Sequence, residues 1–181
     1  MRARVCARAN GLIRQWLLRL KGGKLRNSTA GSQEIDCLMV AYAAETHCGL
    51  VRSLNEDCYE ADPDVGLWLV ADGVGGHAGG EIASELTRAT IKEVFHRTGD
   101  LRAAIEAAHA AVLDAIRRGD GSSNMGSTVV ALALRGRDYE IAWVGDSRAY
   151  LWDGRLTLLT RDHSLVETRS EERRVGKECR L

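Results

Sequence analysis

The chain has 181 residues, 45% hydrophobic and 28% charged, a balance that is typical of one globular domain and unlike that of a disordered chain. Because 25 Lys and Arg offset 25 Asp and Glu, no net charge favours binding to nucleic acid or to acidic lipid. No apolar run reaches the roughly 18 residues of a membrane-spanning helix, and no secretory signal pattern is present, so we expect a cytoplasmic protein without a transmembrane segment.

Residues 1–36 differ in charge from the rest, because every charged residue before Glu34 is Lys or Arg. Apolar residues recur there at the spacing of one helix face: Ile13, Trp16, Leu17 and Leu20. This pattern predicts a short basic amphipathic helix, and residues 22–23 and 27–32 a linker. Docking to a membrane surface or a partner is one interpretation of this extension. A flexible arm, or a start codon placed too early, are the others.

From Cys37 onward the chain alternates strand and helix signals. Short apolar runs predict strands over residues 38–42, 67–71, 127–134, 139–144, 148–152 and 155–159. Helical periodicity predicts two helices, residues 81–96 and 101–117. Asp100 is placed to cap the second helix and Gly119 to end it, while Asp153-Gly154 predicts a hairpin turn. Strands, then helices, then a strand meander predict an α+β fold with antiparallel sheets.

Three stretches place carboxylates beside apolar runs: Val51–Asp57, Leu69–Ser84 and Trp143–Leu151. In the second, Asp72 closes an apolar run, and the glycines after it leave the backbone open. This arrangement suits a hard divalent cation that prefers oxygen ligands. Taken alone, each stretch also fits a structural role: a Gly-rich turn after Asp72, a capped turn at Asn55–Asp57, and a plain hairpin turn at Gly145–Ser147. Neither the P-loop nor the EF-hand pattern is present.

Five short motifs follow one another in the chain: R-x-x-N-E-D (Arg52–Asp57), A-D-G-V-G-G-H (Ala71–His77), G-S-T (Gly126–Thr128), V-G-D-S-R (Val144–Arg148) and L-T-R-D-H-S (Leu159–Ser164). In this order they resemble the bacterial branch of the metal-dependent protein phosphatases, the PPM family, also called type 2C serine/threonine phosphatases. The similarity runs from about residue 46 to about residue 167. It implies an α-β-β-α sandwich of two antiparallel sheets flanked by helix pairs, with a binuclear Mn²⁺ or Mg²⁺ centre at one edge.

The resemblance also implies which residues hold metal. Asp72 matches the carboxylate that bridges both ions, and the Gly73 carbonyl matches a ligand to one of them. Glu56 and Asp57 match groups that hold metal-bound waters. Asp146 matches an acidic residue that helps to hold a weaker third ion in bacterial members.

Asp57 belongs to the expected catalytic set together with Arg52, which matches the phosphate-binding arginine, and His77, which lies near the site. A guanidinium can contact two phosphoryl oxygens at once. Two cations about 3.5–4 Å apart can make a water acidic enough to attack phosphorus near neutral pH. Other branches of the family place a histidine proposed as general acid where this chain has Val74. The leaving oxygen is therefore expected to receive its proton by another route.

The pattern departs from the family near its end, because no Asp follows Asp162 whereas the family has two more metal-binding aspartates. Residues 169–179 resemble the translation of a sequencing adapter, and a genuine solvated helical tail is the alternative. We therefore expect a partial phosphatase domain over 37–167, a non-native tail over 168–181, and a fragment with little or no activity.

The expected function is hydrolysis of phosphoserine and phosphothreonine in proteins, opposing a Ser/Thr kinase, by a monomer that binds no nucleic acid. A non-catalytic phosphoprotein-binding or regulatory module is the first alternative, and a plain metal-binding or structural α+β domain is the second. The enzyme is favoured by the presence of Arg52, Glu56, Asp57, Asp72 and Gly73. Gly66–His77 and Met125–Leu132 also resemble the phosphatases of bacterial type VI secretion clusters.

Overall fold

A computed structural model describes residues 4–8, 15–26, 34–48, 50, 54–76, 79–136 and 138–163. Within these residues lie nine strands and two helices. The strands are β1 (Arg4–Arg8), β2 (Gln15–Arg26), β3 (Glu34–Glu45), β4 (Asp57–Asp62), β5 (Leu67–Val74), β6 (Gly126–Arg135), β7 (Asp138–Val144), β8 (Arg148–Trp152) and β9 (Leu156–Leu158). The helices are α1 (Gly79–Thr98) and α2 (Leu101–Arg118).

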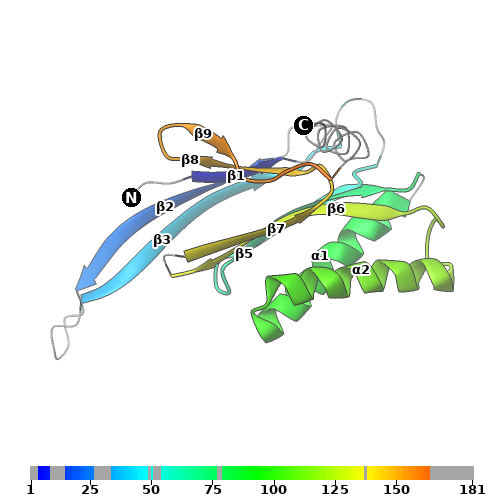
Figure 1. Ribbon diagram of the computed structural model, residues 1–181, viewed down its shortest axis with the longest axis horizontal. Helices are drawn as coiled ribbons and strands as arrows, with labels where there is room; N and C mark the ends of the chain where they lie inside the picture. Colours follow the sequence, from blue (N-terminus) through cyan, green and yellow to red (C-terminus); the bar gives the residue numbers. More distant parts are fainter. Residues whose placement is uncertain are drawn as a thin grey trace, which may run out of the picture.

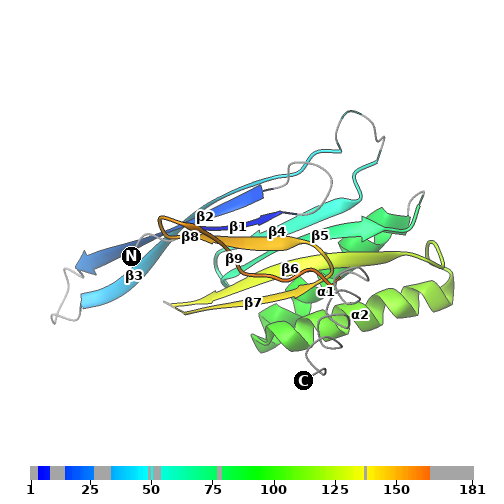
Figure 2. The same ribbon diagram turned by 45° about the horizontal axis from the view of Figure 1, so that its top comes forward.

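The strands form two antiparallel sheets. The inner sheet has the strand order β4-β5-β6-β7 and the outer sheet the order β3-β2-β1-β8-β9. Helices α1 and α2 cover the face of the inner sheet that points away from the outer sheet (Figures 1 and 2). The described residues thus form three layers, helices on sheet on sheet, which confirms the predicted α+β class with antiparallel sheets. They contain no second helix pair on the outer sheet, so the fourth layer that the resemblance implies stays a prediction.

Strand β5 is buried on both faces because it lies between two apolar cores. Leu67 and Leu69 pack towards the helices, together with Ile91 of α1. Trp68 and Val70 pack towards the outer sheet, in the core between the sheets. Side chains alternate along a strand, so a central strand covered on both sides needs a continuous apolar run.

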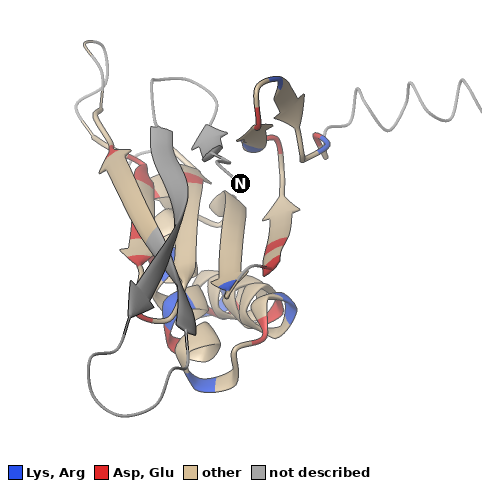
Figure 3. Ribbon diagram, turned by 90° about the vertical axis from the view of Figure 1, so that its left-hand side faces the viewer, with Lys and Arg blue, Asp and Glu red and all other residues tan. Residues whose placement is uncertain are grey.

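Helix α2 begins and ends as its sequence predicts. Asp100 Oδ1 accepts a hydrogen bond of 2.9 Å from the Ala103 amide, which satisfies one of the free donors of the first turn. Gly119 ends the helix with a φ of 81°, a left-handed conformation that glycine adopts without steric cost. Lys, Arg, Asp and Glu are mixed over the helical layer (Figure 3). No helix in the described part of the chain is long and apolar enough to cross a membrane.

The amphipathic helix expected near Ile13–Leu20 is wrong, because residues 15–26, Gly22 and Gly23 included, form strand β2. Twelve register pairs join β2 to β3, from Gln15↔Glu45 to Arg26↔Glu34. A helix of that length is marginal without tertiary packing, whereas β2 pairs with β3 along its whole length and with β1 at Trp16–Arg19, which satisfies backbone groups on both of its edges there. The boundaries expected at 36/37 and 167/168 stay predictions.

Two further details differ from the sequence expectations. Asp57 begins a strand, β4, that the sequence analysis did not predict, and β5 continues two residues beyond Asp72. Gly145–Ser147 is not a plain hairpin turn, because it connects β7 of the inner sheet to β8 of the outer sheet. The predicted hairpin at Asp153-Gly154 is present, with a loop of residues 153–155 between β8 and β9.

The packing of α1 on the inner sheet can be tested with two isoleucines of the same helix. Ile91 is fully buried, whereas Ile82 is 37% exposed. We expect Ile91→Ala to lower the free energy of unfolding by about 2–5 kcal/mol, because it leaves a cavity in the core. Ile82→Ala should change it by at most about 1 kcal/mol. Urea denaturation followed by circular dichroism measures both values, and equal losses would contradict the packing described here.

Candidate metal and phosphate site

A row of polar residues crosses three strands of the inner sheet where the core between the sheets ends. Asp57 of β4 is in register with Asp72 of β5, and Asp72 is in register with Thr128 of β6. All three lie on the face that points to the outer sheet, since Val70 and Val130, two residues along β5 and β6, pack in the core between the sheets. Residues in register across antiparallel strands have their side chains next to each other.

This row brings two carboxylates together in a partly dehydrated place. Asp57 is 7% exposed and Asp72 is half-buried. Like charges directly opposite each other on neighbouring strands lower the stability of a sheet, and a nearby cation offsets that cost. The row therefore supports a cation at this end of the sandwich.

Glu56 joins the row through a close approach of three backbone segments. Its carbonyl accepts a hydrogen bond of 2.9 Å from the Gly73 amide. A Cβ at Gly73 would lie 1.9 Å from the Gly80 carbonyl oxygen, and a Cβ at Gly80 would lie 2.6 Å from Glu56 Oε1. A Cβ at Gly73 would overlap backbone atoms, whereas a Cβ at Gly80 would displace the end of the Glu56 side chain. The Glu56 carboxylate thus lies at the first turn of α1, where the helix dipole favours negative charge.

Asp146 is tied to the same row through Thr128. The Thr128 and Ser147 hydroxyls are hydrogen-bonded at 2.7 Å, and Ser147 is 1% exposed. Gly145 packs so closely on Thr128 that a Cβ there would lie 2.7 Å from its Cγ2 atom. Both neighbours of Asp146 therefore contact the residue in register with Asp72. Thr128 was not expected to have a role, because strand register is not visible in the sequence.

The donors that this site offers fit a hard divalent cation. They are the carboxylates of Glu56, Asp57 and Asp72, all oxygen, which Mn²⁺ and Mg²⁺ prefer. Among the described residues no three Asp, Glu, His or Cys side chains are grouped as a metal cage. The described residues therefore supply a partial set of oxygen donors. Arg52 and His77, both expected in the catalytic set, lie outside the described residues.

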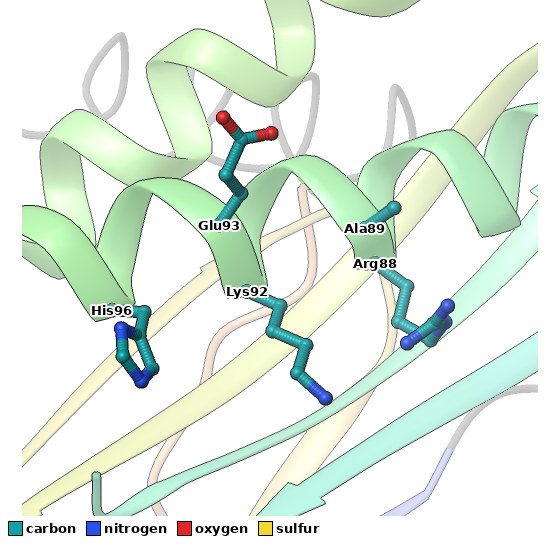
Figure 4. Close-up of a pocket in the computed structure, with 5 residues that line it drawn as sticks. All are labelled: Arg88, Ala89, Lys92, Glu93 and His96. Atoms are coloured by element: carbon teal, nitrogen blue, oxygen red, sulfur yellow. The ribbon is translucent and has the colours of Figure 1, made fainter.

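A shallow pocket elsewhere on the surface is not part of this site. It has a volume of about 390 Å³ and is lined by Arg88, Ala89, Lys92, Glu93 and His96 of α1 (Figure 4). Arg88 and Lys92 form ion pairs with Glu60 of β4. Arg88 lies eight residues after Gly80, which is about 12 Å along the helix. The pocket and the carboxylate row are therefore separate features, and His96 and His109 lie on the exposed surface.

Cys58, next to Asp57, is unsuited to be a nucleophile. It projects to the opposite face of β4, where its Sγ atom donates a hydrogen bond of 3.1 Å to the Ser84 carbonyl of α1. Burial raises the pKa of the Cys58 thiol to about 12. A thiolate is the reactive form of cysteine, so this thiol is inert near neutral pH. The structure thus disfavours a cysteine-based phosphatase chemistry at this position.

The raised pKa of Cys58 predicts slow alkylation. In the folded chain near neutral pH, the thiolate fraction of Cys58 should be roughly 1,000-fold smaller than at the ordinary pKa of 9.0. Iodoacetamide labelling of the Cys58 peptide, followed by mass spectrometry, should be very slow in buffer and fast in concentrated urea. Comparable rates in the two conditions would show that the thiol is neither buried nor perturbed.

The close approach at Gly73 predicts that it cannot be replaced. Gly73→Ala should lower the free energy of unfolding by about 1–3 kcal/mol or more, because the new methyl group overlaps the Gly80 and Glu56 carbonyls. Gly126→Ala is the matched control, since the nearest atom to a Cβ there is Val74 Cγ2 at 3.7 Å. That variant should be neutral or more stable by about 0.4–1 kcal/mol. The midpoints of urea denaturation measure both stabilities. A Gly73→Ala variant as stable as Gly126→Ala would rule out the close approach of Gly73 to Gly80 and Glu56.

The chain is similar to known proteins of one family. A family model described as Protein phosphatase 2C matches residues 40–180. The serine/threonine protein phosphatase PstP of Mycobacterium tuberculosis (strain CDC 1551 / Oshkosh) is 37% identical over 148 residues, which cover 78% of this chain and 28% of PstP.

Two solved structures have the same fold. The catalytic domain of PstP in complex with 2 manganese ions matches with a TM-score of 0.65 at 37% identity, covering 73% of this chain and 60% of that one. PppA, a key regulatory component of T6SS in Pseudomonas aeruginosa, matches with a TM-score of 0.62 at 40% identity, covering 72% and 60%. This chain thus spans less than a third of PstP from M. tuberculosis and about 60% of each solved chain. Since the family model covers most of the chain, the chain belongs to the protein phosphatase 2C family, in its bacterial branch.

Proposed function

We propose that the protein to which this chain belongs hydrolyses phosphoserine and phosphothreonine in proteins, with a divalent metal activating the attacking water. The observation that carries this proposal is the register Asp57↔Asp72, which places two carboxylates side by side at the end of a sandwich of this family. The structure of PstP with 2 manganese ions supports Mn²⁺, and Mg²⁺ shares the same preference for oxygen ligands.

In this proposal Asp72 and the Gly73 carbonyl hold two ions, and Asp146 contributes to a weaker third. When bound, such ions supply a water that is acidic enough to attack phosphorus near neutral pH. Glu56 and Asp57 accept hydrogen bonds from water and so orient it. The rigid contact of Glu56 with Gly73 and Gly80 fixes where that acceptor lies.

The phosphoryl group is assigned to Arg52, whose guanidinium can donate two parallel hydrogen bonds to its oxygens and offset their charge. We assign His77 to the edge of the same site. Both assignments rest on the motifs R-x-x-N-E-D and A-D-G-V-G-G-H. Because position 74 is Val, the leaving oxygen takes its proton from water and not from a side chain at this position.

We further propose that the substrates are phosphoproteins made by a Ser/Thr kinase, and that the protein is a cytoplasmic monomer. The similarity to PppA supports substrates connected with type VI secretion. We propose that this chain alone turns substrate over slowly, because the family's two further aspartates have no counterpart after Asp162. Metal binding is therefore the primary measurement for this chain.

The deciding experiment compares two Asp→Asn variants at opposite ends of the β4–β5 hairpin. Asp72→Asn removes the proposed bridging carboxylate, whereas Asp64→Asn changes an exposed carboxylate in the turn between the strands. Mn²⁺ binding is measured by the loss of the free-ion EPR signal. Asp72→Asn should weaken binding by more than about tenfold, since even outer-sphere partners of a metal contribute 10–100-fold. Asp64→Asn should bind like the unchanged chain.

Equal Mn²⁺ affinity in the two variants would defeat the metal site and with it the proposed enzyme. A phosphopeptide assay with Mn²⁺ then separates the alternatives. Slow release of phosphate that disappears in Asp72→Asn supports the enzyme. Tight phosphopeptide binding with no release, unchanged in Asp72→Asn, supports the non-catalytic module instead.

A further inference from the structure

The motif L-T-R-D-H-S (Leu159–Ser164) has no role in the proposed chemistry, yet several contacts join it to the motif V-G-D-S-R (Val144–Arg148). We call residues Leu159–His163 the strap. They follow β9 and lie along the segment Trp143–Ala149, which contains Asp146 at its centre. Thr160 of the strap is 5% exposed, which is unusual for a residue outside regular structure.

The strap forms hydrogen bonds and a ring stack with the residues on the N-terminal side of Asp146. Trp143 Nε1 donates a hydrogen bond of 2.7 Å to the Arg161 carbonyl, and the His163 amide donates one of 2.9 Å to the Gly145 carbonyl. The His163 ring also stacks on the Trp143 ring, with 5.9 Å between centroids and 21° between planes. An offset stack of this kind adds to the energy of burial.

The strap also forms an ion pair and hydrogen bonds with the residues on the C-terminal side of Asp146. Arg148 Nε and Nη2 donate to the two carboxylate oxygens of Asp162 at 2.9 and 2.5 Å, a bidentate pair with a fixed geometry. The Ala149 amide donates to Thr160 Oγ1 at 3.1 Å, and the Ala149 carbonyl accepts from the Leu159 amide at 2.8 Å. The Arg148 guanidinium lowers the pKa of Asp162 from its usual value, so this carboxylate stays ionised near neutral pH.

The loop of residues 145–147, between β7 and β8, has little regular structure of its own to fix its conformation. Gly145 has a φ of 99°, and glycine loses more conformational freedom on ordering than any other residue. The loop crosses from one sheet to the other, so it is not part of a hairpin ladder. Thr128 of β6 contacts Gly145 and Ser147. The strap contacts Gly145, Arg148 and Ala149. Asp146 therefore lies within a segment that two independent sets of contacts hold on both sides of it.

We propose that the strap positions Asp146 for metal, with Asp162 and Arg148 as positioning residues. The inference rests on the proposed function, because it assumes that Asp146 helps to hold the weaker ion. Outer partners that fix the orientation of a ligand are worth about 10–100-fold in metal affinity. On this view the fifth motif belongs to the metal site although none of its residues is assigned to the metal.

The test uses Asp162→Asn, which keeps the shape of the side chain and removes the negative charge that pairs with Arg148. Asp120→Asn is the matched control, since Asp120 also accepts a hydrogen bond of 2.8 Å from an arginine, Arg118, but at the end of α2. Two quantities are measured in the full 181-residue chain. They are amide hydrogen exchange in peptides covering residues 143–149 without metal, and Mn²⁺ binding by EPR.

Asp162→Asn should speed exchange in residues 143–149 and weaken the weaker class of Mn²⁺ sites about tenfold. The tighter class, which depends on Asp72, should keep its affinity. Asp146→Asn should weaken the same class, and the double variant Asp146→Asn/Asp162→Asn should be no weaker than Asp146→Asn alone. This non-additivity is what a purely structural role would not produce.

Three results would overturn the proposal. One is unchanged exchange in residues 143–149, which would mean that the strap does not hold the loop. Another is faster exchange with unaltered Mn²⁺ binding, which would leave the strap a structural element only. Additive effects in the double variant are the third. If the unchanged chain shows no Asp72-dependent Mn²⁺ binding, the proposed function itself fails, and the exchange data still report whether the strap holds the loop.

Discussion

The register of β4 on β5 and of β5 on β6 is the constraint on which the rest of the site depends. Strand pairing has a side-chain period of two, so a slip of one residue would move Asp57 or Asp72 from the face between the sheets to the helical face. The apolar residues of β5 fix this register, because Trp68 and Val70 belong to one core while Leu67 and Leu69 belong to the other. The packing of two hydrophobic cores thus sets the position of two carboxylates.

The second constraint is the close approach of three backbone segments at Glu56, Gly73 and Gly80. It attaches the loop before β4 to the start of α1, which connects the carboxylate row to the helical layer. Helix α1 is in turn held by Ile91 and Phe95 in the core beneath it. A binding site at the rim of a sandwich therefore gains its rigidity from packing well inside the domain, as the precision of metal ligands requires.

The motifs of the family are contiguous in space as well as ordered in sequence. Backbone pairing joins the second motif to the third, the Thr128–Ser147 hydrogen bond joins the third to the fourth, and the Arg148–Asp162 pair joins the fourth to the fifth. Some of these residues are therefore explained by contacts with one another and not by contact with a substrate. A motif residue in such a network need not touch the reacting atoms.

The sequence by itself determined the elements whose signals are local. Helix α2 has a capping Asp100 and a terminal Gly119 and was predicted to within one residue, and the apolar run of β5 fixed the start of that strand but not its end. The order of motifs also determined the family. Only the tertiary structure decided that residues 15–26 pair as a strand, because their apolar spacing fits a helix face and the competing partners, β1 and β3, come from other parts of the chain. It also decided the row Asp57–Asp72–Thr128 and the strap around Asp146, since register and contacts between sheets are set by long-range packing that no local pattern encodes.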